Sequence, residues 1–172
     1  MDLGIKDFIV DSNRNRYENK HFYKNQEKKL KKLQRQLSKK QKGRNNRNKL
    51  KIKLAKVHEK ISNQRNTYLH QITSKLVNEN QIICIEDLNV KGMMSNHKLA
   101  KSISDLSFYE FRRQLEYKCR WYGRDLVIID RFYPSSKTCH NCGYIYKDLK
   151  LSEREWICPH CKSKIDRDYN AA

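Results

Sequence analysis

Four cysteines near the end of the chain restrict its fold more than any other feature. Cys139 and Cys142 form one C-x-x-C pair, Cys158 and Cys161 form a second pair, and 15 residues lie between the two pairs. Each pair turns tightly enough to direct two thiolates at one ion, and this separation is typical of a zinc ribbon with four cysteine ligands. A structural zinc site is therefore predicted. Two disulfides or four unrelated buried thiols are the alternatives.

The charge of the chain indicates a polyanionic partner. The net charge is +19, and 18 of the 38 basic residues lie between Lys20 and Arg65, where the only acids are Glu27 and Glu59. Such a local positive charge favours nucleic acid, because phosphate contacts release condensed counterions. A solvated or disordered basic segment is the alternative.

Size and composition predict one main core with a small metal-stabilised appendage, since the chain has 172 residues. No run of about 20 apolar residues and no signal-peptide pattern is present, so we expect a soluble, cytoplasmic protein with no membrane partner. Cys84 and Cys119 lie in apolar contexts and are typical of buried thiols in a reducing compartment. The sequence does not indicate an oligomeric state.

The basic segment has helical periodicity. Apolar residues recur at intervals of three and four over residues 27–41 and again over residues 50–76, and the turn formers of residues 43–46 separate the two runs. This pattern predicts a basic helical hairpin over residues 26–78, with an internal apolar seam and an outer face of lysine and arginine.

The other segments predict an α/β core. Residues 5–10 and 16–23 are typical of a β-hairpin. Further on, a buried strand, a mobile loop, a helix and a second buried strand are expected, and this order favours a parallel strand pair with a crossover. The segments are, in that order, residues 81–85, 90–104, 107–122 and 126–129.

Three acids lie where strands or helices begin or end: Asp2, Glu86 and Asp168. In an open α/β sheet, groups far apart in sequence converge at strand ends. Carboxylates brought together repel one another unless a cation lies between them, and hard oxygen ligands select Mg²⁺ or Mn²⁺. Two such ions promote phosphodiester hydrolysis, so the pattern indicates a metal-dependent nuclease. Solvated surface carboxylates are the alternative.

Smaller candidates near the cysteines are open to two interpretations each. His140 and His160 lie in the knuckles, where polar surface roles are favoured over metal binding. Aromatic side chains of the ribbon either stack on bases or pack around the knuckles. Lys137 and Arg167 flank the acids and either contact phosphate or remain solvated. The aromatic residues are Tyr133, Tyr144, Tyr146 and Trp156.

Four motifs occur in an informative order: DLGIKDF at 2–8, IEDLNVKGM at 85–93, SSKTCHNCG at 135–143 and DRDYNAA at 166–172. Together they resemble the TnpB (OrfB) proteins of insertion sequences, which are related to type V CRISPR effector nucleases. The resemblance covers essentially the whole chain. It implies a RuvC-like, RNase H-like mixed sheet with the zinc ribbon inserted before its last helix.

The resemblance also implies an activity and its residues. Asp2, Glu86 and Asp168 would be the catalytic carboxylates and the ligands of Mg or Mn, with Asp166 as a flanking residue. The expected function is that of a transposon-associated DNA endonuclease that uses two-metal hydrolysis. DNA and a guide RNA from the transposon end are the implied partners. The implied location is the cytoplasm of a prokaryotic cell, with association to the nucleoid when the protein is bound to DNA.

The implied domains are a RuvC-like nuclease core over residues 1–132, a target-binding zinc ribbon over 133–165, and the start of the final RuvC-like segment over 166–172. Members of the family are usually much longer, so the resemblance implies truncation at both ends, beside catalytic elements. An inactive fragment that only binds nucleic acid is the alternative function. A third is a zinc-ribbon interaction module whose charge only gives solubility.

Overall fold

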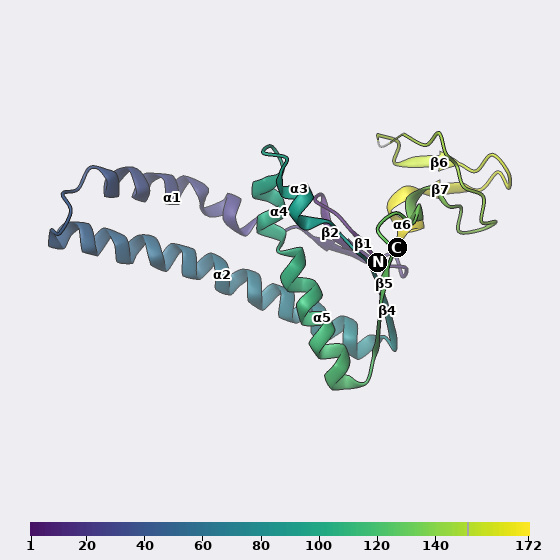
Figure 1. Cartoon of the computed structure of the whole chain (residues 1–172), viewed down its shortest axis with the longest axis horizontal. Helices are drawn as coiled ribbons and strands as arrows, with labels where there is room; N and C mark the ends of the chain where they lie inside the picture. The colour runs from purple at the N-terminus through teal and green to yellow at the C-terminus, as the bar shows by residue number, and fades with distance from the viewer. Residues whose placement is uncertain (151) are drawn as a thin grey trace.

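The computed structural model describes residues 1–150 and 152–172. It has mixed α and β content in three visible parts (Figure 1). A body of strands and helices lies in the centre, a long pair of helices extends away from it, and a small ribbon lies on the other side, next to both chain ends.

The N-terminal strands form one antiparallel sheet. β1 (Asp2–Leu3), β2 (Asp7–Val10) and β3 (Arg16–Glu18) pair in that order. Buried Asp11 closes the β2–β3 turn, because its carboxylate accepts hydrogen bonds from the backbone and the side-chain amide of Asn15. The predicted β-hairpin is confirmed, although its second strand is shorter than expected.

The basic segment forms two long helices, α1 (Phe22–Ser38) and α2 (Asn45–Glu79), which pack side by side. Their seam is apolar and its centre is formed by Leu30, Val57 and Ile61. Both predicted helices are confirmed, and each begins several residues earlier than the periodicity indicated. No helix in the described ranges is both long enough and apolar enough to cross a membrane.

Two parallel strands, β4 (Ile82–Glu86) and β5 (Asp125–Ile129), form a second sheet. Between them the chain forms α3 (Val90–Met94), α4 (Ala100–Leu106) and α5 (Phe108–Tyr122). The predicted order of strand, helix and parallel strand is confirmed.

The mobile loop predicted over residues 90–104 is wrong, because α3 and much of α4 occupy it. The Asn89 side chain accepts a hydrogen bond from the Gly92 N–H and so caps α3. α4 buries Ile103 and Leu106 in the main core. Helices of five and seven residues are too short to show a period in the sequence.

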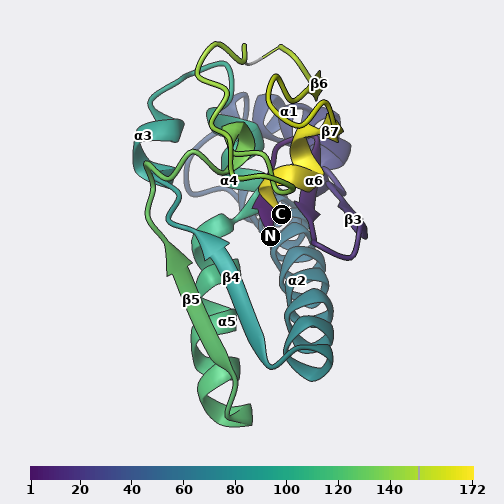
Figure 2. The same ribbon diagram turned by 90° about the vertical axis from the view of Figure 1, so that its right-hand side faces the viewer.

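The description of β4 and β5 as buried strands is correct for one face only. The side chains of Ile82 and Val127 are 60% and 44% exposed. α2 and α5 cover one face of this sheet (Figure 2), so alternate side chains point away from them. The main core lies on the covered face and includes Leu69, Ile72, Leu76, Ile83, Ile85, Phe111 and Leu115.

Asp105 on α4 joins the long helices to the body. Its buried carboxylate accepts hydrogen bonds from the backbone N–H of Tyr23, at 3.0 and 2.9 Å, and from Arg65 Nη2 at 3.0 Å. Tyr23 lies in the first turn of α1, where helix N–H groups lack partners within the helix. Asp105 therefore caps α1 and pairs with α2 at once.

The C-terminal part is a small ribbon followed by one helical turn. A 3₁₀ turn, η1 (Ser135–Lys137), leads into it, and β6 (Glu155–Ile157) pairs antiparallel with β7 (Lys164–Asp166). α6 (Arg167–Ala171) follows directly and contacts η1 and β1. The ribbon thus ends in a helix that lies beside the N-terminal sheet.

Candidate nuclease and zinc sites

The four cysteines of the two C-x-x-C pairs meet in space. Their Sγ atoms all lie within 4.8 Å of one another. The Cys139–Cys161 and Cys142–Cys158 separations are 3.6 and 3.7 Å. Zn–S bonds of about 2.3 Å place the sulfurs of a tetrahedral site roughly 3.8 Å apart, so the thiolates fit one zinc ion. All six cysteines are described and free, which excludes the disulfide alternative for this structure.

The two knuckles have the same backbone geometry. The Gly143 N–H donates to the Cys139 carbonyl at 2.8 Å, and the Lys162 N–H donates to the Cys158 carbonyl at 2.9 Å. Gly143 and Lys162 both have positive φ, 74° and 62°. Glycine adopts this conformation without strain, and at Lys162 the turn imposes it on a residue with a Cβ. The backbone is therefore bent around the ion site twice.

Five of the other ribbon candidates have side-chain contacts within the chain, whereas Tyr133 is 54% exposed. The rings of Tyr146 and Trp156 lie 5.6 Å apart in the ribbon core. The rings of Tyr144 and His160 stack at 6.1 Å. His140 bonds to Asn170 through its ring nitrogen at 2.9 Å. The structure thus favours the packing and polar roles over a ligand role for the histidines.

The three predicted acids line one open cleft of about 450 Å³. Asp2 comes from β1, Glu86 from the end of β4, and Asp168 from α6. Among the described residues, however, only the four thiolates have ligand atoms close enough to hold a single ion. The three acids therefore line the same cleft, but their carboxylate oxygens do not lie close enough together to bind one shared ion.

Asp2 interacts electrostatically with both of the other carboxylates. Burial and then the charges of Glu86 and Asp168 raise the pKa of Asp2 to about 6. The Met1 ammonium and Arg167 oppose this rise. The three carboxylates therefore lie close enough to repel one another, and a cation between them would relieve this repulsion.

The raised pKa of Asp2 predicts a pH-dependent stability. Between about pH 4 and pH 6 the folded chain holds a proton that the unfolded chain has lost, so this contribution to stability is present at low pH and disappears as the pH rises through 6. Asp2→Asn should therefore stabilise the chain more at pH 7.5 than at pH 4, by about 2 kcal/mol. Urea unfolding at both pH values measures the difference. Asp148→Asn, at an exposed site outside the cleft, is the control, and an equal response of the two variants would contradict the assignment.

Glu86 is oriented by the segment that leads into the ribbon. The Ser135 hydroxyl donates to Glu86 Oε1 at 2.6 Å. Ser135 itself begins η1, and its carbonyl accepts a hydrogen bond from the Asn170 amide at 3.0 Å. The base of the ribbon therefore touches both the carboxylate on β4 and the helix that carries Asp168.

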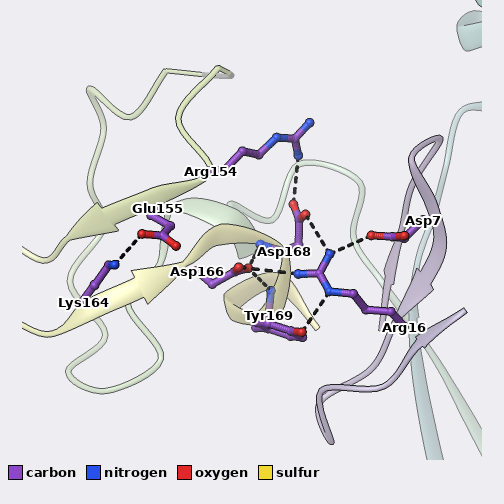
Figure 3. Close-up of polar contacts among 8 residues, drawn as sticks. All are labelled: Asp7, Arg16, Arg154, Glu155, Lys164, Asp166, Asp168 and Tyr169. Atoms are coloured by element: carbon purple, nitrogen blue, oxygen red, sulfur yellow. Dashed lines mark hydrogen bonds and ion pairs between the residues drawn. The ribbon is translucent and has the colours of Figure 1, made fainter. Parts of the chain in front are cut away.

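Asp168 is oriented by a helix cap. The Asp166 carboxylate accepts hydrogen bonds from the backbone N–H groups of Asp168 and Tyr169 at 3.0 and 3.1 Å, so it caps α6 (Figure 3). Asp168 Oδ1 accepts from Arg154 Nη1 at 3.0 Å. The residue expected to flank the site therefore starts the helix that presents Asp168.

Asn170 fixes α6 to the base of the ribbon. Its amide donates to the carbonyls of Ser135 and Thr138 at 3.0 and 2.6 Å, and its Oδ1 accepts from the backbone N–H of His140 at 3.0 Å. These bonds position the helix relative to the first knuckle. The sequence contains this residue in the DRDYNAA motif, but the motif alone does not show what it contacts.

Three functional candidates were absent from the sequence-based set: Arg16, Arg154 and Ser135. Arg16 and Arg154 face Asp168, and Ser135 faces Glu86. In a chain with 38 basic residues, no local signal distinguishes these arginines. Of the predicted flanking cations, Arg167 lines the cleft, whereas Lys137 donates to the Lys147 carbonyl at 2.8 Å.

Two solved structures share the fold of this chain. The chain has the fold of part of Cas12f. It superposes on a Cas12f1–sgRNA–target DNA complex with a TM-score of 0.64 and 19% identity, covering 99% of this chain and 46% of that one. A CRISPR-Cas12f ternary complex gives a TM-score of 0.67 and 21% identity, covering 99% and 36%.

Sequence comparison gives the family. The OrfB_IS605 model, described as "Probable transposase", matches residues 1–97, and the model "Cas12f1-like, TNB domain" matches residues 108–172. The chain belongs to the OrfB (TnpB) family, as its motifs indicated.

Two curated relatives have informative names. A "Putative RNA-guided DNA endonuclease" of Streptomyces pristinaespiralis is 45% identical over the whole of this chain, which covers 42% of that protein. The "Putative RNA-guided DNA endonuclease InsQ" of Escherichia coli K12 is 33% identical, again over the whole chain, with 46% of that protein covered. The chain thus spans less than half the length of these relatives.

Proposed function

We propose that the chain is the nuclease part of a metal-dependent DNA endonuclease. The observation that carries this proposal is the convergence of Asp2, Glu86 and Asp168 on one cleft from β1, β4 and α6. Hard oxygen ligands suit Mg²⁺ or Mn²⁺. Two ions about 3.5–4 Å apart need ligands on two sides, so a cleft with separated carboxylates is compatible with such a pair.

The arrangement of strands supports a RuvC-like, RNase H-like core. β1 lies beside β4, and the Met1 nitrogen donates to the Cys84 carbonyl at 3.0 Å. If this contact joins the two sheets, the strand order is β3-β2-β1-β4-β5, with the first three antiparallel and the last two parallel. We propose the same division as the motifs imply: a core over residues 1–132, a ribbon over 133–165 and the final segment from 166.

Each residue of the cleft has a proposed role. Asp2 and Asp168 would bind and bridge the two ions, and Glu86 would complete the shell of one of them. When bound, the ions supply an activated water and stabilise the leaving oxygen. Ser135 keeps Glu86 in orientation, and Asp166 keeps Asp168 in orientation. Arg131, Arg154 and Arg167 line the cleft, where guanidinium groups suit phosphate oxygens.

The relatives' names extend the proposal to partners. They are named as RNA-guided DNA endonucleases, and the Cas12f1 structure contains sgRNA and target DNA. We propose DNA as the substrate and a guide RNA as a partner. The basic helical hairpin would then contact the nucleic-acid backbone, where it contributes charge and base pairing contributes sequence.

The hairpin proposal predicts a strong salt dependence. Affinity for DNA or RNA should fall steeply between 50 and 200 mM salt, because each neutralised phosphate contributes about 0.7–0.9 to the logarithmic slope. Replacing the exposed Lys28, Lys32 and Lys39 with glutamine should reduce the slope by about two to three. Fluorescence anisotropy measures the slope, and circular dichroism checks that the helices persist. A slope that is flat, or unchanged in the variant, would reject this role.

Divalent-ion binding tests the cleft itself. We expect the purified chain to bind Mn²⁺, measured by the loss of the free-ion signal in electron paramagnetic resonance. Glu86→Gln should weaken binding at least tenfold, since even changes around a metal shell cost about 10–100-fold. Glu79→Gln makes the same charge change at an exposed site and should have little effect. A wild-type chain that binds no Mn²⁺ would favour the alternative, a nucleic-acid-binding piece without its own chemistry.

A further inference from the structure

Arg16 joins the N-terminal sheet to the helix that carries Asp168 (Figure 3). Its Nη1 contacts Asp7 Oδ2 on β2 at 2.7 Å, and its Nε donates to the Tyr169 hydroxyl at 2.9 Å. The guanidinium also lies over the Tyr169 ring, 4.6 Å from its centre. Arg16 and Tyr169 are 153 residues apart in sequence, so this contact exists only in the folded chain.

The same guanidinium faces both acids of α6. Arg16 Nη2 lies 3.6 Å from Asp166 Oδ2, and Nη1 lies 3.9 Å from Asp168 Oδ2. The shortest contacts therefore go to Asp7 and Tyr169, whereas the contact with Asp168 is longer than a hydrogen bond. The Asp168 carboxylate therefore lies near Arg16 but does not accept a hydrogen bond from it.

α6 is held from two directions. On the ribbon side, the Asn170 amide bonds to two carbonyls of the preceding segment. On the sheet side, Arg16 contacts Tyr169 and Asp166, which stand on either side of Asp168 in the sequence. A helix of five residues has little stability of its own, so its orientation depends on such contacts.

We propose that Arg16 is a positioning residue, which holds α6 against the β2–β3 hairpin and thereby sets Asp168 opposite Asp2 across the cleft. The proposal rests on the proposed function, because it assigns Arg16 to the ion site of that function. It requires the planar fork of arginine, which bonds Asp7 and Tyr169 from different nitrogens while it stacks on the ring. The single ammonium of lysine keeps the charge but cannot reproduce this geometry.

Substitution of Arg16 by lysine separates geometry from charge. We expect Arg16→Lys to raise the dissociation constant for Mn²⁺ about tenfold, with zinc content and melting temperature little changed. The backbone amide signals of residues 166–171 should shift in the nuclear magnetic resonance spectrum without added Mn²⁺. Tyr169→Phe, which removes one of the bonds, should give a smaller loss of Mn²⁺ affinity.

Arg14→Lys is the matched control, because Arg14 belongs to the same hairpin and its guanidinium lies further from the Tyr169 ring, at 5.9 Å. It should leave Mn²⁺ affinity within about twofold of wild type. Unchanged affinity and unchanged amide signals in Arg16→Lys would overturn the proposal. Tighter Mn²⁺ binding in Arg16→Gln would overturn it too, since Arg16 would then act mainly as an opposing charge.

Two separate measurements test the proposed function and the role of Arg16: Mn²⁺ binding by the wild-type chain, and the amide signals of residues 166–171. If the wild-type chain binds no Mn²⁺, the proposed function fails, and the position of α6 is judged from the amide signals alone. Shifted signals in Arg16→Lys would then support Arg16 as the anchor of α6, and unshifted signals would reject it.

Discussion

Replacing Cys158 with serine is expected to remove the zinc and unfold the ribbon. The thiol is fully buried, and its sulfur lies 3.7 Å from that of Cys142, within the four-sulfur group. The buried apolar residues around the knuckles are only Leu149, Trp156 and Ile165 among those described, too few to hold a fold without metal. Structural zinc contributes about 10–16 kcal/mol to the folding of small zinc-dependent domains. We therefore expect the loss of a zinc ligand to destabilise the ribbon more than any other single substitution.

Metal analysis and tryptophan fluorescence measure this loss. The wild-type chain should retain about one zinc, and Cys158→Ser should retain none. In a Trp121→Phe background, which removes the exposed tryptophan, the emission of buried Trp156 should shift to longer wavelength as the ribbon unfolds. Cys84→Ser is the matched control, because this cysteine lies on β4, outside the sulfur group. A Cys158→Ser chain with zinc and unshifted emission would disprove the four-thiolate site.

The ribbon also contacts the elements that carry the acids of the cleft. Its first knuckle and the preceding turn bond to Asn170, and Ser135 of that turn bonds to Glu86. A zinc ion bound by the four thiolates would have a structural role in this arrangement. It would stabilise residues 135–140, which contact both α6 and Glu86, and would thereby couple the ribbon to the carboxylates.

The sequence predicts the parts of this molecule that depend on local chemistry. Two C-x-x-C pairs specify a metal-binding ribbon because the ligands lie within each turn. The periodicity of α1 and α2 is visible because the helices are long. By contrast, α3 and α4 are set by a cap at Asn89 and by burial of Ile103, and neither effect leaves a repeating pattern.

In the candidate site, too, some residues could be predicted from the sequence and others could not. The acids were predictable as a set, since their motifs place them at element ends, and the structure brings all three to one cleft. The side chains that orient them were not predictable. Arg16 reaches Tyr169 across 153 residues, and Ser135 reaches Glu86 across 49, so these partners follow from the tertiary fold rather than from spacing.

Asp168→Asn is expected to abolish DNA cleavage, whereas Asp166→Asn should not. Asparagine at 168 is almost isosteric with aspartate but removes the charge with which the site would bind and bridge its ions, so the rate should fall at least ~10²–10³-fold. Asparagine at 166 can still accept the hydrogen bonds from Asp168 N–H and Tyr169 N–H, because asparagine caps helices about as well as aspartate. Its rate should stay within about threefold of wild type.

The two variants form a matched pair, since each removes one negative charge from the same motif, at positions two residues apart. The measurement is single-turnover cleavage of labelled DNA by the purified chain in Mg²⁺ or Mn²⁺. Equal cutting by Asp168→Asn and wild type would point to contamination or to another site, and a larger loss in Asp166→Asn would exchange the roles of the two acids. If the wild-type chain binds DNA with the expected salt dependence but does not cut it, the cleft holds the acids without the geometry that hydrolysis requires. The chemistry would then depend on regions that the Streptomyces relative has outside the 42% of its length that this chain covers.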